Sequence, residues 1–143
     1  MTEQATERTT IDAPPEKVYE VLLDLDRYPE WARDIKEVTI LESDGVGRPS
    51  LVRFRAAAMG HSARYALRYD HGQEGRLAWV LEQGDIVRKL DGEYLLEPTP
   101  SGGTEVTYHL EVELAVPLPG FIKRRAESKI MTTALDELKR RCE

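Results

Sequence analysis

Residues 121–142 read "FIKRRAESKIMTTALDELKRRC" and form the longest helical pattern in this 143-residue chain. The turn "PLPG" at 117–120 separates this pattern from the strand-like segment in front of it. Its apolar residues recur at helical spacing and make a wide apolar face: Ile122, Ala126, Ile130, Met131, Ala134, Leu135 and Leu138. A helix with such a face has to be covered by another layer of the fold.

The segments in front of the helix have the alternating pattern of strands. In "TEVTYHLEVEL" (104–114), Val106, Tyr108 and Leu110 share one face, and polar residues occupy the other. Five segments before it alternate in the same way and are separated by short turns: 35–41, 51–59, 62–70, 75–82 and 87–98. A threonine-rich first strand spans 5–11. The pattern predicts an antiparallel sheet with one apolar face and one wet face.

Residues between the first and second strands predict two short helices. Pro14 and Pro15 in "APPEKVYEVLLDL" (13–25) suit a helix start, and the apolar residues after them recur at helical spacing. Pro29 either closes this helix or opens a second one. We therefore expect an α+β fold in one domain over 1–143, with a curved seven-stranded antiparallel sheet wrapping the long final helix. A curved sheet cannot follow a straight helix along its whole length, so a cavity is expected between them.

Composition excludes several classes of function. The chain has 26 acidic and 20 basic side chains and a formal net charge of −6, which argues against a nucleic-acid-binding face and a polybasic membrane anchor. No apolar run approaches the ~20 residues of a membrane span, and the first residues lack a signal-peptide pattern. The one cysteine, Cys142, cannot form an internal disulfide. We expect a cytoplasmic monomer or homodimer.

The sequence resembles a known superfamily in several separated segments. These are "IDAPPEKVYEVLLDLDRYPEW", "GEYLLEP", "GGTEVTYHLEVEL" and "PLPGFIKRRAESKIMTTALDELKRR". They are similar to the START-like helix-grip (SRPBCC) superfamily, and more narrowly to its polyketide cyclase/dehydrase and Coq10-like branch, from about residue 5 to residue 141. The resemblance implies a hydrophobic cavity between the sheet and the last helix.

The inward phase of the strands and helix gives the candidate ligand-binding residues. Most have large apolar or aromatic side chains, which suit a flat or lipid-like molecule: Phe54, Tyr65, Tyr69, Trp79, Tyr94, Tyr108, Ile130 and Met131. Trp31, in "LDRYPEW" (25–31), is expected where the cavity meets solvent. Arg88 and Glu127 are charged residues in apolar phases. They either pair across the cavity, anchor a ligand's polar end, or lie in a bulge (Arg88) and at the helix surface (Glu127).

Three functions fit this pattern. The first is binding of a small hydrophobic or aromatic molecule (a lipid, a quinone or a polyketide-like compound) without chemistry. The second is a polyketide aromatase/cyclase that positions its substrate and stabilises an enolate, with Arg88 as the candidate cation. The third is a protein-interaction role with a vestigial cavity.

The sequence predicts no metal and no cofactor. His61, His71 and His109 lack the spacing of a metal site, and neither a phosphate-binding glycine loop nor a nucleophile elbow is present. Catalytic residues are therefore not assigned.

Overall fold

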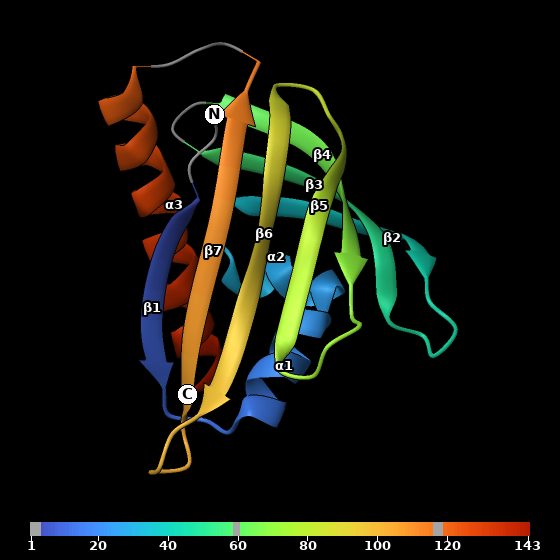
Figure 1. The fold of residues 1–143 in the computed structure, drawn as a ribbon. Coiled ribbons are helices and arrows are strands. Elements are labelled where there is room, and N and C mark those ends of the chain that lie inside the picture. Colours follow the sequence, from blue (N-terminus) through green and yellow to red (C-terminus); the bar gives the residue numbers. More distant parts are fainter. Residues whose placement is uncertain (1–3, 59–60, 116–118) are drawn as a thin grey trace.

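The computed structural model describes residues 4–58, 61–115 and 119–143. Its elements in chain order are β1 (Ala5–Ile11), α1 (Pro15–Leu23), the 3₁₀ turn η1 (Leu25–Arg27), α2 (Tyr28–Trp31), β2 (Ile35–Ser43), β3 (Pro49–Ala58), β4 (His61–Asp70), β5 (Arg76–Gly84), β6 (Val87–Pro98), β7 (Thr104–Leu114) and α3 (Gly120–Cys142). Figure 1 shows the long helix α3 beside the sheet and the two short helices behind it, α2 near the middle and α1 below.

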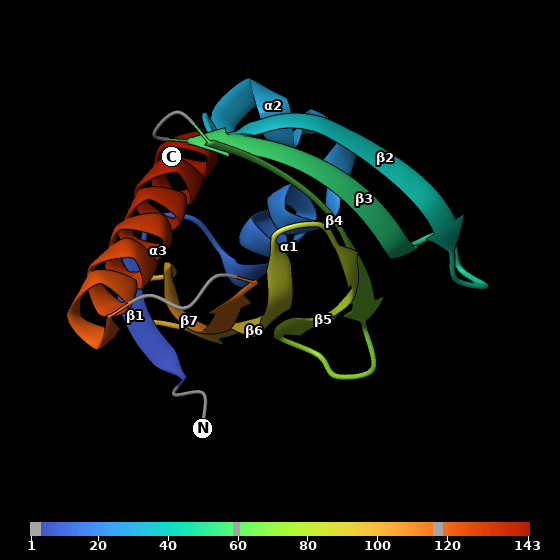
Figure 2. The same ribbon diagram turned by 90° about the horizontal axis from the view of Figure 1, so that it is seen from above.

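The seven strands form one antiparallel sheet in the order β1-β7-β6-β5-β4-β3-β2. Strands β2 to β7 follow the chain as a meander, and β1 adds to the far edge by pairing with β7. The sheet curves strongly, so that β2 and β3 lie opposite β6 and β7 (Figure 2). The α+β fold, the seven strands and the two short helices after the first strand are confirmed.

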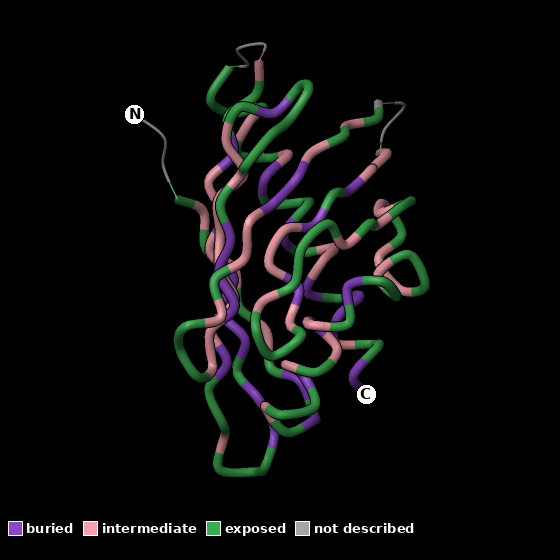
Figure 3. Tube along the Cα trace, turned by 90° about the vertical axis from the view of Figure 1, so that its right-hand side faces the viewer, coloured by how far each residue is buried: buried purple, intermediate pink, exposed green. Residues whose placement is uncertain are grey.

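Helix α3 packs over the β1–β7 side of the sheet and contacts α1 and α2 at its C-terminal half. Its buried residues include Met131, Leu135 and Leu138, which join Leu22 and Val106 in the core. Buried segments run along the inner side of the chain trace, while the turns are exposed (Figure 3). Helix α3 covers one side of the curved sheet. Of the aromatic residues on the other strands, Phe54 and Trp79 are buried, whereas Tyr65 and Tyr69 of β4 are only partly buried.

The segment "RYPEW" is folded into α2. Pro29 lies in the first turn of this short helix. Of the two alternatives, that Pro29 closes the first helix or opens a second one, the structure has the second. The Tyr28 hydroxyl donates a hydrogen bond of 2.6 Å to the carbonyl oxygen of Leu22, one of the last carbonyls of α1. Terminal helix carbonyls lack partners within their own helix, so this bond fixes α2 against the end of α1.

Candidate functional site

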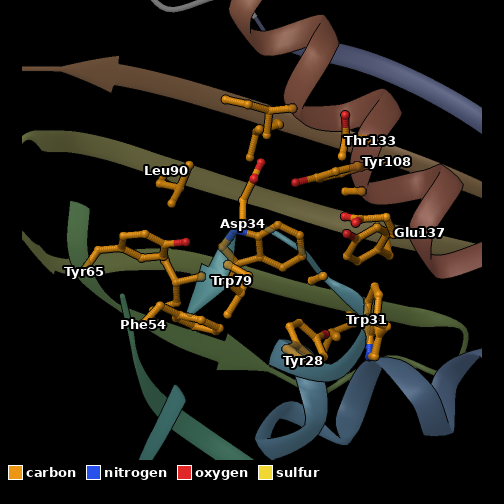
Figure 4. A pocket seen from close by; sticks show the side chains of 18 of the residues that line it. Tyr28, Trp31, Asp34, Phe54, Tyr65, Trp79, Leu90, Tyr108, Thr133 and Glu137 are labelled. Carbon is orange, nitrogen blue, oxygen red and sulfur yellow. The ribbon is translucent and has the colours of Figure 1, made fainter. Parts of the chain in front are cut away.

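A cavity of about 170 Å³ lies between the inner face of the sheet and α3. Its walls come from β3 to β7, from α2 with the start of β2, and from the middle of α3. Figure 4 shows Thr133 and Glu137 of α3 across the cavity from Phe54 and Tyr65. Ile130 lines the cavity and is 44% exposed, so the cavity opens to solvent beside α3.

Eight of the 19 residues that line the cavity are aromatic. Phe54 and Tyr65 stack across β3 and β4, with ring centroids 5.4 Å apart and an interplanar angle of 21°. Tyr94 and Tyr108 contact each other across β6 and β7 at 4.5 Å, and Trp79 lies within 6.0 Å of both. These pairs arise because residues that face one another on antiparallel strands point to the same side of the sheet. The wall is therefore fixed by strand register.

Gly92 makes room for the ring of Trp79. The two residues pair across β5 and β6, and a Cβ built on Gly92 would lie 2.8 Å from Trp79 Cζ2 and 2.6 Å from the backbone oxygen of His109. Any side chain at this position would push the indole ring out of place. The glycine thus sets the position of the largest ring in the cavity.

The cavity tyrosines are held in their neutral form. Burial raises the pKa of Tyr65 and Tyr94 well above that of a free phenol, and it does the same for Tyr69 and Tyr108. A neutral phenol both donates and accepts a hydrogen bond. The wall therefore offers polar contacts to a ligand without carrying charge.

The charged residues that line the cavity are Asp34, at the junction of α2 and β2, and Glu137, on α3. Glu137 is 7% exposed, and its Oε2 accepts a hydrogen bond of 3.1 Å from the backbone N–H of Arg33. The Nε atom of Arg33, on an exposed side chain, lies 3.7 Å from the same oxygen. These contacts connect α2 to α3 at the edge of the cavity.

Eight of the eleven residues predicted to bind a ligand line this cavity: Trp31, Phe54, Tyr65, Tyr69, Trp79, Tyr94, Tyr108 and Ile130. Met131 is fully buried in the core instead. It occupies the adjacent position on α3, where the helix faces its packing partners rather than the cavity. Glu127 is buried one turn before Met131 and does not line the cavity.

Arg88 does not line the cavity, and of the alternatives for this residue, a contact within the cavity or a bulge, the structure has the bulge. Its side chain is exposed, although Leu90, two residues later, lines the cavity. The register between β6 and β7 shifts between Val87 and Lys89, so the strand has a bulge at Arg88. A bulge breaks the alternation of faces on which the expectation rested.

Sequence reasoning missed the polar residues at the cavity edge. Thr133 and Glu137 follow Ile130 at helical spacing, so the helical pattern carried a signal for them. Asp34 lies in the short connection before β2, where no periodic pattern applies. Apolar residues between the predicted rings were also missed: Leu67, Leu77, Leu90 and Leu110.

The described residues contain no group of three or more metal-binding side chains of the His, Cys, Asp and Glu types. Of the histidines, His71 contacts the carbonyl of Pro49 and His109 contacts the hydroxyl of Thr6, while the side chain of His61 is outside the described part. None of the helices in the described ranges has the length and apolar character needed to cross a membrane.

A curved antiparallel sheet that holds a C-terminal helix, with an apolar cavity between them, defines a protein of the helix-grip fold. The family model described as "Polyketide cyclase / dehydrase and lipid transport" matches residues 2–143. The chain belongs to this family. Comparison with the curated proteins finds no match.

Solved structures with the same fold come from several bacteria. A START superfamily protein from Mycobacterium smegmatis has a TM-score of 0.92 at 24% identity, covering 97% of this chain and 96% of that one. The Zhui aromatase/cyclase from Streptomyces sp. R1128 has a TM-score of 0.84 at 18% identity, with 99% and 94% covered. A STAR-related lipid transfer protein from Xanthomonas axonopodis has a TM-score of 0.73 at 14% identity, with 97% and 85% covered. These likenesses show the fold, and the Coq10-like part of the resemblance stays a prediction.

Proposed function

We propose that this protein binds a small hydrophobic, ring-bearing molecule in the cavity between its sheet and α3. The observation that carries the proposal is the cavity itself, about 170 Å³ in volume and walled by aromatic and aliphatic side chains. Protein interiors are otherwise close-packed, and an apolar space of this size is large enough to hold an apolar ligand. A cavity of about 150 Å³ lined by aliphatic and aromatic residues binds benzene.

The size of the cavity limits its occupant. Sites for drug-sized ligands have volumes of roughly 300–1,000 Å³. At about 170 Å³, the cavity suits one or two fused rings, or the end of a longer molecule that leaves through the opening beside Ile130. A quinone ring, an aromatic polyketide fragment and one end of a lipid all meet this limit.

The arrangement favours binding over the aromatase/cyclase alternative. Ring closure through an enolate needs a group that stabilises negative charge as it develops. Arg88, the cation considered for that role, lies at an exposed bulge, and the described residues that line the cavity include no lysine or arginine. The phenols could donate hydrogen bonds, but two carboxylates in the same cavity would oppose an enolate.

Native mass spectrometry of the purified protein, followed by extraction of any bound compound, tests the proposal. A co-purified small molecule would name the ligand class. A complementary NMR experiment would follow the indole N–H signals of Trp31 and Trp79 while 2-naphthylethanol is added. We expect both signals to shift, because both rings line the cavity. An empty protein whose two indole signals do not respond to this probe or to a panel of apolar ring compounds would refute the proposal.

A further inference from the structure

The cavity has a one-sided distribution of charge. Asp34 and Glu137 place carboxylates on its lining, whereas lysine, arginine and histidine are absent from the described residues that line it. The remaining polar side chains of the lining are neutral: the tyrosines, Trp31, Trp79 and Thr133. A ligand that enters the cavity therefore meets negative charge without a compensating cation on the wall.

Glu137 is the buried member of this pair. One of its oxygens, Oε2, accepts the backbone N–H of Arg33, while Oε1 makes no hydrogen bond within the described ranges. The Arg33 guanidinium approaches Oε2 from the solvent side, where water screens its charge. Glu137 as a residue is only 7% exposed, and a cation or hydrogen-bond donor inside the cavity would find a free acceptor in its Oε1 atom and offset part of the cost of burying this side chain.

Asp34 adds a second acceptor at the same edge. Its carboxylate makes no hydrogen bond or ion pair with the part of the chain that the structure describes. It follows Arg33 directly, and the Arg33 backbone is bonded to Glu137, so both carboxylates belong to the place where α2 meets α3. Two acceptors at one edge define where a ligand's polar end would lie.

The aromatic wall favours the same sign of charge. The faces of tyrosine and tryptophan rings carry negative electrostatic potential and attract cations within about 6 Å. Trp31 lines the cavity from α2, next to the acidic edge, and Tyr108 lies between Thr133 and Glu137 in Figure 4. Rings and carboxylates together resemble, in chemical terms, a site for an organic cation.

We propose that the cavity selects ring-bearing molecules with an amine or ammonium head and excludes carboxylates. The ring packs on the aromatic wall, and the head lies at the edge formed by Asp34 and Glu137. This inference rests on the proposed function, because it specifies the ligand class of the same cavity. A carboxylate of equal size would face two like charges in a poorly hydrated space.

Three probes of nearly equal shape test this selection by isothermal calorimetry at pH 7. They are 2-(2-naphthyl)ethylamine, which carries an ammonium head, 2-(2-naphthyl)ethanol, which is neutral, and 2-naphthaleneacetate, which carries a carboxylate head. We expect the amine to bind at least tenfold more tightly than the acetate, with the alcohol between them. Glu137→Gln and Asp34→Asn should each reduce this ratio at least threefold. Gln at 137 keeps an oxygen that can accept the Arg33 N–H, so the fold should be retained.

Asp136→Asn is the matched control. Asp136 is exposed on α3, one residue before Glu137, so the variant changes the net charge equally without touching the cavity lining. Its ratio of affinities should equal that of the unmodified protein. Equal binding of all three probes, or ratios unchanged in both Glu137→Gln and Asp34→Asn, would overturn the charge selection while leaving the cavity as a binding site. Failure of all three probes to bind would overturn the proposed function as well.

Discussion

Filling the cavity from α3 should stabilise the protein and block binding. Ala134 lines the cavity on the helix, opposite the rings of the sheet. Unfilled space in a core costs about 24 cal/mol per Å³, so an empty space of 170 Å³ corresponds to a ceiling of about 4 kcal/mol. Ala134→Phe would fill part of this space with its phenyl ring and so bury additional apolar surface.

The expected gain is well below that ceiling. Part of the space lies near the opening beside Ile130, where a new side chain stays partly exposed to solvent, and one phenyl ring fills only part of the volume. We therefore expect the free energy of unfolding to rise by about 1 kcal/mol, which at this chain length raises Tm by roughly 2–4 °C. Affinity for 2-naphthylethanol should fall more than tenfold, because probe and side chain compete for one space.

Urea unfolding and calorimetric titration measure the two effects on the same preparation. Thr132→Phe is the control, since Thr132 is exposed on the same helix and its substitution adds a ring outside the cavity. This control should leave affinity unchanged. Unchanged binding in Ala134→Phe would refute the location of the site, and a loss of stability above 1 kcal/mol would show that no space exists at this position.

Three further predictions concern the groups that shape the cavity. Gly92→Ala should lower the free energy of unfolding by about 1–3 kcal/mol and alter tryptophan fluorescence, whereas Gly45→Ala, with nothing within 4 Å of its new Cβ, should stay within about 0.5 kcal/mol in the same urea experiment. Tyr28→Phe should cost about 0.5–1.5 kcal/mol, measured in the same way, because the Leu22 carbonyl loses its donor; an unchanged stability would contradict the role of this bond. The buried tyrosines should contribute fully to the free energy of unfolding below about pH 10, the pKa of an unfolded tyrosine. Above that pH the unfolded state loses phenol protons that the folded state keeps. The free energy of unfolding should then fall by up to about 1.4 kcal/mol per pH unit for each phenol whose pKa is raised in the folded state. Absorbance at 295 nm would follow this titration, and ionisation near pH 10 without loss of stability would contradict it for these residues: Tyr28, Tyr65, Tyr69, Tyr94 and Tyr108.

The arrangement of elements could be predicted because each has a strong local pattern. The segments 87–98 and 104–114, read as strands from their alternation, coincide with β6 and β7. The first hairpin was less predictable, since β2 and β3 continue to a pair between Ser43 and Pro49. Asp44 holds this turn through hydrogen bonds to the backbone N–H groups of Val46 and Arg48. Contacts of this kind in a turn let the hydrogen-bonded pairing of β2 and β3 continue past the residues whose apolar and polar side chains alternate.

The aromatic wall could be predicted from the same alternation, because one register assigns every inward ring at once. The errors occurred where alternation or helical phase no longer determines direction. The bulge, one of the alternatives for Arg88, turns its side chain outward, and the rotation of about 100° between adjacent helix residues separates the buried Met131 from Ile130 at the cavity. A position on a wide apolar helix face does not tell whether a residue meets the core or a cavity, since both are apolar surroundings.

The two kinds of cavity residue therefore have different origins. The rings belong to paired strands, where changing one position disturbs its cross-strand partners, as the contact between Gly92 and Trp79 illustrates. Asp34 and Glu137 belong to a connection and a helix edge, where side chains change without altering the register of the sheet. The apolar cavity follows from the sheet, whereas the charge preference that we propose for its ligand depends on the α2–α3 edge. Within one fold, ligand preference can then change at this edge while the aromatic wall stays the same.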